Sequence, residues 1–104
     1  MIHRRAALAL FLSLALGHPL FAATLPPGFS ETIVASVSQP TGFVFTPDGR
    51  LLILEKTGAI RVVKNGTLLP AAAATLALTS NGERGLLGIA LDPAFAATGH
   101  LFVY

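Results

Sequence analysis

A six-residue pattern occurs twice in this 104-residue chain, with the two copies 46 positions apart. Gly42–Pro47 reads GFVFTP and Gly88–Pro93 reads GIALDP, so each copy is a glycine, an apolar run and a polar residue before proline. A second apolar run follows each copy, at Leu51–Leu54 and, after a connection four residues longer, at Leu101–Tyr104. Repeats of roughly 40 to 50 residues that hold several short strands are typical of β-propeller blades. The alternative is a chance likeness between two hairpins.

Turn signals divide the first copy into short apolar segments. Thr46–Gly49 places proline and glycine where a tight turn needs them, and Asn65–Gly66 is the strongest hairpin signal in the sequence. The sequence therefore predicts a four-stranded antiparallel meander. The expected strands are Phe43–Phe45, Leu51–Leu54, Ala59–Lys64 and Thr67–Leu69.

Three further segments flank this meander. Phe29–Val37 alternates between apolar and polar residues, apart from Glu31, and is predicted to be a strand that could close a propeller. Ala71–Leu78 has helical propensity but is short and lies between a proline and a turn, which favours an extended connection. Leu86–Leu91 is an apolar run bounded by turn signals, which indicates a strand buried on both faces.

The first 23 residues have the organisation of a secretory signal peptide. Arg4 and Arg5 precede the apolar run Ala6–Leu16, and small residues allow cleavage after Ala22 or Ala23. We therefore expect export to the periplasm or the medium, with residues 24–104 as the mature part; an uncleaved anchor is the alternative. Because the chain has no cysteine, the exported part has to rely on a hydrophobic core rather than on disulfides.

The charge balance excludes two classes of partner. The formal net charge of +2 comes from Arg4 and Arg5, since five basic and five acidic residues balance from Thr24 onward. A neutral mature chain has no electrostatic footprint for nucleic acid or for an anionic membrane. We therefore expect no nucleic-acid partner and no stable membrane insertion once the signal peptide is removed.

Gly82–Gly85 is the candidate binding segment. Glu83 and Arg84 stand between glycines, directly before the apolar run that starts at Leu86. Binding residues are often mounted on such loops at the ends of rigid strands. The alternative is an exposed ion pair in a tight turn.

Three stretches of this chain resemble the start of the glucose/sorbosone dehydrogenases. They are LPPGFSETIVA, QPTGFVFTPDGRLLILEKTGAIRVVKNG and GERGLLGIALDPAFAATGHLFVY, and they cover most of residues 25–104. The resemblance implies an all-β fold, a six-bladed β-propeller of four-stranded antiparallel blades, of which these residues form the first one and a half. It also implies a soluble aldose sugar dehydrogenase that uses pyrroloquinoline quinone (PQQ) and calcium and oxidises the anomeric hydroxyl to a lactone. A sugar and an electron acceptor would be its partners, and this chain would be an N-terminal fragment without activity of its own.

The resemblance assigns a role to one residue of this chain, a position that contacts the cofactor in the family. Family members hold a glutamine just before the Gly-Leu-Leu segment, and Glu83 occupies that position here. An ionised glutamate cannot donate a hydrogen bond to the carboxylates of PQQ as glutamine can, so this departure bears directly on cofactor binding. The family's catalytic histidine and calcium ligands have no counterpart among these residues, and His100 is expected to be structural. The alternatives are an exported propeller that only binds a partner and, less favoured, a calcium-dependent lactonase.

Overall fold

The computed structural model describes residues 24–104, so the expected signal peptide lies outside the described residues. The chain divides into two compact units, Met1–Glu31 and Thr32–Tyr104. In the described part of the first unit, a turn forms at Pro26–Phe29, where the Phe29 amide donates to the Pro26 carbonyl at 3.2 Å. All the described strands lie in the second unit. No helix of the described residues is long and apolar enough to cross a membrane.

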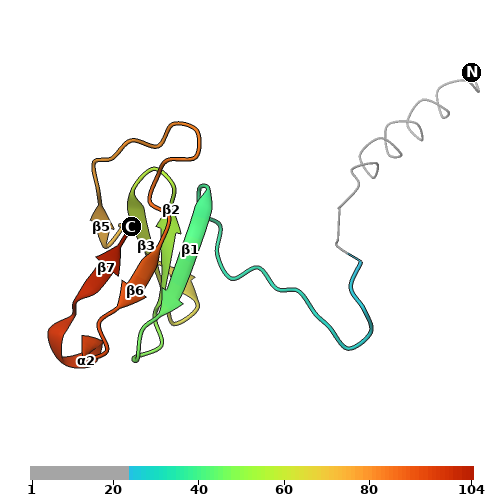
Figure 1. Ribbon diagram of the computed structural model, residues 1–104. Coiled ribbons are helices and arrows are strands. Elements are labelled where there is room, and N and C mark those ends of the chain that lie inside the picture. Colours follow the sequence, from blue (N-terminus) through green and yellow to red (C-terminus); the bar gives the residue numbers. More distant parts are fainter. Residues whose placement is uncertain (1–23) are drawn as a thin grey trace, which may run out of the picture. The chain divides into compact units, whose positions relative to one another are not determined.

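The larger sheet of the second unit is an antiparallel meander (Figure 1). Each strand pairs with its neighbour in the chain, in the order β1-β2-β3-β4, and β5 also pairs with β3. The four strands expected from the sequence are all present. They are β1 (Pro40–Phe45), β2 (Leu51–Glu55), β3 (Ala59–Lys64) and β4 (Thr67–Leu68), and the sheet also contains β5 (Ala74–Thr75).

The residues at the turns explain why the strands end where they do. Between β3 and β4, Asn65 and Gly66 have φ angles of 51° and 75°. Two successive positive φ angles are the geometry of a type I′ hairpin, whose twist matches that of the paired strands. Between β1 and β2, Gly49 has φ 86° and its amide donates to the Thr46 carbonyl at 2.9 Å.

The outermost strand of this sheet is interrupted. β4 and β5 both pair antiparallel with β3, at opposite ends of it. Between them, the Leu69 and Ala73 amides donate to the Val62 and Ile60 carbonyls, each at 2.8 Å. Pro70 has no amide hydrogen to donate, so the ladder breaks there. The extended conformation predicted for Ala71–Leu78 is confirmed, because this stretch holds β5 and no helix.

A second, two-stranded sheet repeats the pairing of the first. β6 (Ile89–Leu91) pairs antiparallel with β7 (Leu101–Val103), and the longer connection between them holds the short helix α2 (Phe95–Thr98). Ile89 lies opposite Val103 and Leu91 opposite Leu101. The equivalent positions of the first hairpin pair in the same way. The two copies of the sequence pattern therefore have the same local structure.

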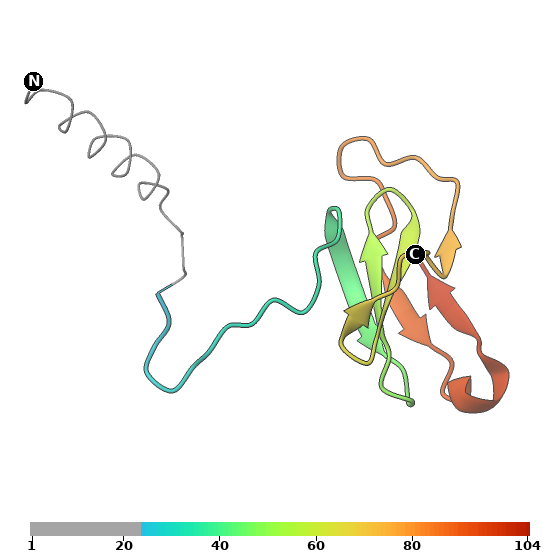
Figure 2. The ribbon, with the colours of Figure 1, turned by 180° about the vertical axis from the view of Figure 1, so that it is seen from behind.

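The core lies between one face of the larger sheet and the smaller sheet (Figures 1 and 2). Leu54 is fully buried and Leu86, just before β6, is 2% exposed. Burial of a leucine side chain contributes about 1.5 to 3 kcal/mol, so this contact holds the two sheets together. The buried cluster is Leu52, Leu54, Ile60, Val62 and Leu86, and Val44, Leu69, Ile89, Leu91 and Leu101 pack against it.

Two expectations were wrong. Phe29–Val37 forms no strand, and Ile33 is 82% exposed. Side-chain alternation favours a strand only where a neighbouring edge accepts its backbone hydrogen bonds, and no described strand pairs with this segment. Leu86–Leu91 is not a strand buried on both faces, since the strand begins at Ile89 and both Leu87 and Ala90 are exposed. One face of this strand packs on the core and the other is open.

Candidate functional site

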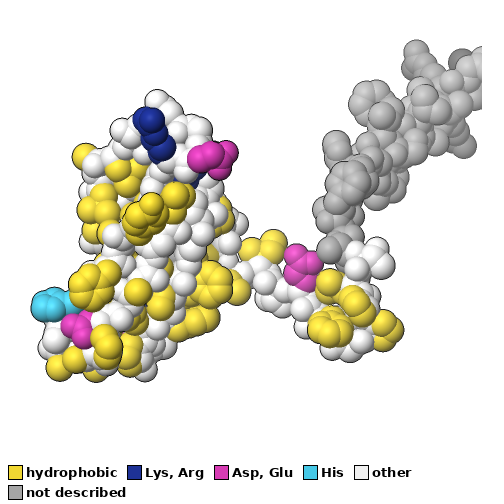
Figure 3. Space-filling model, viewed as in Figure 1, with side chains coloured by type: hydrophobic (Ala, Val, Ile, Leu, Met, Phe, Trp, Pro, Cys, Tyr) yellow, Lys and Arg dark blue, Asp and Glu magenta, His cyan; other side chains and the backbone are white. Residues whose placement is uncertain are grey.

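Glu83 lies in the long loop that connects β5 to β6. This loop is at the same end of the unit as the β2–β3 turn, which contains Lys56 (Figures 1 and 2). Glu83 and Arg84 are both exposed, and the Arg84 amide closes a turn on the Asn81 carbonyl at 3.2 Å. Figure 3 shows basic and acidic side chains together at this end. The prediction that these two residues sit in a loop ahead of a strand is confirmed.

Lys56 holds this loop in place with both its backbone and its side chain. The Leu86 amide donates to the Lys56 carbonyl at 3.0 Å, and the Lys56 ammonium donates to the Gly82 carbonyl. From β1, the Thr41 hydroxyl donates to the Leu86 carbonyl at 2.5 Å. The segment from Gly82 to Leu86 is thus fixed at both ends, with Glu83 between the fixed points.

Gly85 allows the loop to approach the β2–β3 turn this closely. Its φ is 152°, and a Cβ atom at this position would lie 2.6 Å from the Lys56 carbonyl oxygen and 2.6 Å from the Lys56 Cγ. Real Cβ atoms do not come this close to backbone, so any other residue would push the loop away from Lys56. The glycine is needed for close approach of two backbone segments.

Glu83 is not paired with its neighbour. Among residues 24–104, the ion pairs join Arg50 to Asp48 at 2.9 Å and Arg61 to Glu55 at 3.3 Å, and the His100 imidazole lies 3.6 Å from the Asp92 carboxylate. Arg84 therefore does not neutralise the Glu83 carboxylate in this conformation. This result disfavours the exposed Glu83–Arg84 ion pair that the sequence left open.

The charges of this end suit a ligand that carries carboxylates, with one exception. The Lys56 ammonium contacts the residue before Glu83, and the Arg84 guanidinium follows it in the chain. Both cations can donate to a carboxylate. Glu83 has the wrong charge for such a ligand. The role of Lys56 is apparent only in the structure, where the β2–β3 turn and the Glu83 loop lie side by side.

His100 lies at the opposite end and is part of a turn network. Its Nδ1 lies 3.6 Å from the Asp92 carboxylate and its side chain is 71% exposed. Asp92 also accepts from the Ala94 amide at 2.9 Å and from the Thr98 hydroxyl at 3.2 Å. This is the geometry of a residue that shapes the β6–β7 connection, as the structural interpretation of His100 expects.

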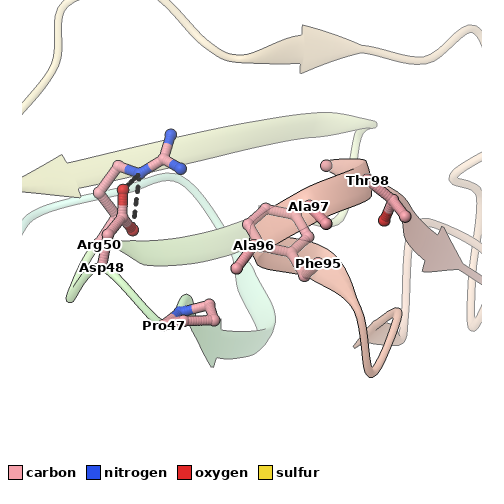
Figure 4. Close-up of a pocket in the computed structure, with 8 residues that line it drawn as sticks. Pro47, Asp48, Arg50, Phe95, Ala96, Ala97 and Thr98 are labelled. Carbon is pink, nitrogen blue, oxygen red and sulfur yellow. Dashed lines mark hydrogen bonds and ion pairs between the residues drawn. The ribbon is translucent and has the colours of Figure 1, made fainter.

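A pocket of about 550 Å³ lies at this opposite end, between the β1–β2 turn and α2 (Figure 4). Asp48 and Arg50 form one wall, and Phe95 and Ala96 form another. Hydrogen bonds from the Thr46 hydroxyl and from Arg50 lower the pKa of Asp48 from 3.8 to about 2. The ionised carboxylate is thus tied to its own turn, which gives it a structural role in the β1–β2 turn.

Residues 24–104 contain no group of three or more histidine, cysteine, aspartate or glutamate side chains arranged to hold a metal. The described unit is all-β and built of antiparallel sheets, like the start of a β-propeller. The family described as Glucose / Sorbosone dehydrogenase matches residues 37–104. The chain belongs to this family.

A similar protein is known from Synechocystis sp., the uncharacterized protein slr1608. It is 35% identical to this chain over 81 residues. The match covers 69% of this chain and 19% of the Synechocystis protein, so the chain spans about a fifth of that relative's length. No solved structure matches the chain.

Proposed function

We propose that this chain supplies the first blade and the Glu83 loop of an exported, PQQ-dependent aldose sugar dehydrogenase with a six-bladed propeller. The observation that carries the proposal is the fixed loop Gly82–Leu86, at the position where the family's cofactor-contacting residue stands. Family membership over residues 37–104 supports the same reaction class. Because the chain spans a fifth of its relative, the activity would belong to a complete family protein.

The residues of the loop fit the cofactor in part. PQQ is a tricarboxylate, and Lys56 and Arg84 supply cationic donors beside Glu83. When bound with calcium, PQQ would supply the two-electron acceptor needed to oxidise the anomeric hydroxyl of an aldose to the lactone. This chain's part is to hold and orient the cofactor: Lys56 and Thr41 fix the loop, and Glu83 sets the charge that the cofactor meets.

The test is a quinone titration of a complete apo-protein, with Glu83→Gln against the unchanged protein. The substitution replaces a carboxylate by a donor, so we expect tighter PQQ binding by about 1 to 3 kcal/mol, or roughly five- to 150-fold in Kd. Glu31→Gln removes a carboxylate from an exposed residue outside the loop and is the matched control. Equal PQQ affinities of Glu83→Gln and the unchanged protein would show that Glu83 does not contact the cofactor. Absence of PQQ binding in all three proteins would refute the proposed function itself.

A further inference from the structure

The segment that leads into β1 has a strained backbone. Gln39 has a φ of 45° and is one of two non-glycine residues with a positive φ among residues 24–104; the other is Asn65, in a turn that favours this geometry. Gln39 instead precedes Pro40, and a residue before proline favours extended backbone. Strained residues of this kind persist only where surrounding contacts hold them, and they gather at functional sites. The contacts that hold Gln39 in place are therefore informative about function.

The end of β2 holds this segment through two hydrogen bonds. The Ser38 amide donates to the Glu55 carboxylate at 3.1 Å, and the Lys56 amide donates to the Gln39 carbonyl at 3.0 Å. Glu55 is only 8% exposed, and its carboxylate is also paired with Arg61 of β3 at 3.3 Å. Because the guanidinium fixes this carboxylate, the strained bend at Gln39 is anchored to both β2 and β3.

A break in the strand register follows directly, at Thr41. The pairing of β1 with β2 shifts between Pro40 and Gly42, as it does at a β-bulge. In a regular strand, alternation would give Thr41 the exposed outer face of β1. Bulges re-aim side chains, and here the Thr41 hydroxyl donates to the Leu86 carbonyl, at the end of the Glu83 loop.

Both supports of the Glu83 loop therefore adjoin the anchored bend. Thr41 follows Gln39 by two residues, and Lys56 directly follows Glu55. Lys56 contacts the loop with its backbone carbonyl and with its ammonium group. A shift of the bend would move both supports together. All these contacts are internal to the second unit, so they hold whatever else covers its outer faces in a longer protein.

We propose that Glu55 is a positioning residue for the Glu83 loop. Its buried carboxylate holds the strained bend at Gln39, and the bend sets where Thr41 and Lys56 hold the loop. Glu55 thus acts through these two residues and not as a ligand of the cofactor. Its effect on the loop is independent of what the loop binds, whereas its effect on PQQ binding rests on the proposed function.

The test replaces the buried ion pair in a complete protein that carries this chain. Glu55→Met/Arg61→Met removes the acceptor for the Ser38 amide and leaves no unpaired buried charge, so we expect this variant to fold. Glu55→Gln/Arg61→Met keeps an acceptor oxygen at residue 55 and differs from the first variant only there. Asp48→Met/Arg50→Met removes the ion pair at the far end of the same hairpin and is the control.

The measurement is native-state hydrogen exchange of the Leu86 amide, which is bonded to the β2–β3 turn, with the Thr46 amide of the β1–β2 turn as reference. In the methionine variant at residue 55, we expect Leu86 to exchange faster by on the order of tenfold while Thr46 is unchanged. The glutamine variant and the control should keep the Leu86 rate of the unchanged protein. A role in overall stability alone would raise the exchange rates of both amides together.

The proposal is overturned if Leu86 exchanges equally fast in the methionine and glutamine variants, or if the rate at Thr46 rises as much as the rate at Leu86. Under the proposed function, PQQ titration of the same proteins should give a higher Kd for the methionine variant than for the glutamine variant. An unchanged protein that binds no PQQ would refute the proposed function, and the exchange rates would still decide the role of Glu55.

Discussion

At the scale of single residues, Gly85 decides whether the Glu83 loop can reach the β2–β3 turn. Gly85→Ala would place a methyl group against the Lys56 backbone, whereas Gly49→Ala would meet open space; φ is positive at both glycines, 152° at Gly85 and 86° at Gly49. Backbone strain is then common to both variants and the steric clash is specific to Gly85. We expect Gly85→Ala to lower the free energy of unfolding by about 1 to 3 kcal/mol more than Gly49→Ala does. Urea unfolding of the two variants in a complete protein measures this difference; equal losses would contradict it.

The sequence identifies the Glu83 loop but not Lys56, the residue that holds the loop in place. Glu83 and Arg84 were recognisable because glycines bracket two charges ahead of an apolar run. Lys56 was not, because its contacts to Gly82 and Leu86 join segments some 26 to 30 positions apart. The sequence indicates such a long-range backbone contact only through a glycine that no turn requires. Here that glycine is Gly85.

At the scale of elements, the β1–β2 turn should make stability depend on pH in the acid range. The pKa of Asp48 is about 2 in the folded chain against 3.8 as its ordinary value, owing to the Thr46 hydroxyl and then Arg50. A lowered folded-state pKa stabilises the fold above the unfolded pKa, so this contribution is complete above about pH 4 and is lost as the pH falls toward 2. Asp48→Asn should abolish this part of the pH dependence. An NMR titration of the Asp48 carboxyl that gives its ordinary pKa would contradict the assignment.

Element prediction succeeded where the neighbours of a strand are close in the sequence. β1 to β4 are joined by short turns with diagnostic residues such as Asn65–Gly66, so local chemistry sets both the turns and the pairing. It failed at Phe29–Val37, where polar and apolar residues alternate but none of the described strands pairs with the segment. It also overestimated the burial of Leu86–Leu91, because an apolar run does not reveal whether a second sheet covers its other face.

At the scale of the whole molecule, export is expected from residues that precede the described part. The basic start and the short apolar run of residues 1–23 predict cleavage after Ala22 or Ala23. Protein recovered from the periplasm should therefore begin at Ala23 or Thr24 when its N-terminus is sequenced. Intact protein in the cytoplasmic fraction, with Arg4 and Arg5 still present, would contradict this expectation.

The most direct test of the proposed dehydrogenase is made on a complete protein that carries this chain. The apo-protein would be loaded with PQQ and calcium, and an aldose would be added without any other electron acceptor. We expect the absorbance of the oxidised quinone to disappear, with one lactone formed for each quinone reduced. A folded protein that binds PQQ but leaves it oxidised in the presence of aldoses, or that binds no PQQ at all, would contradict the proposed function.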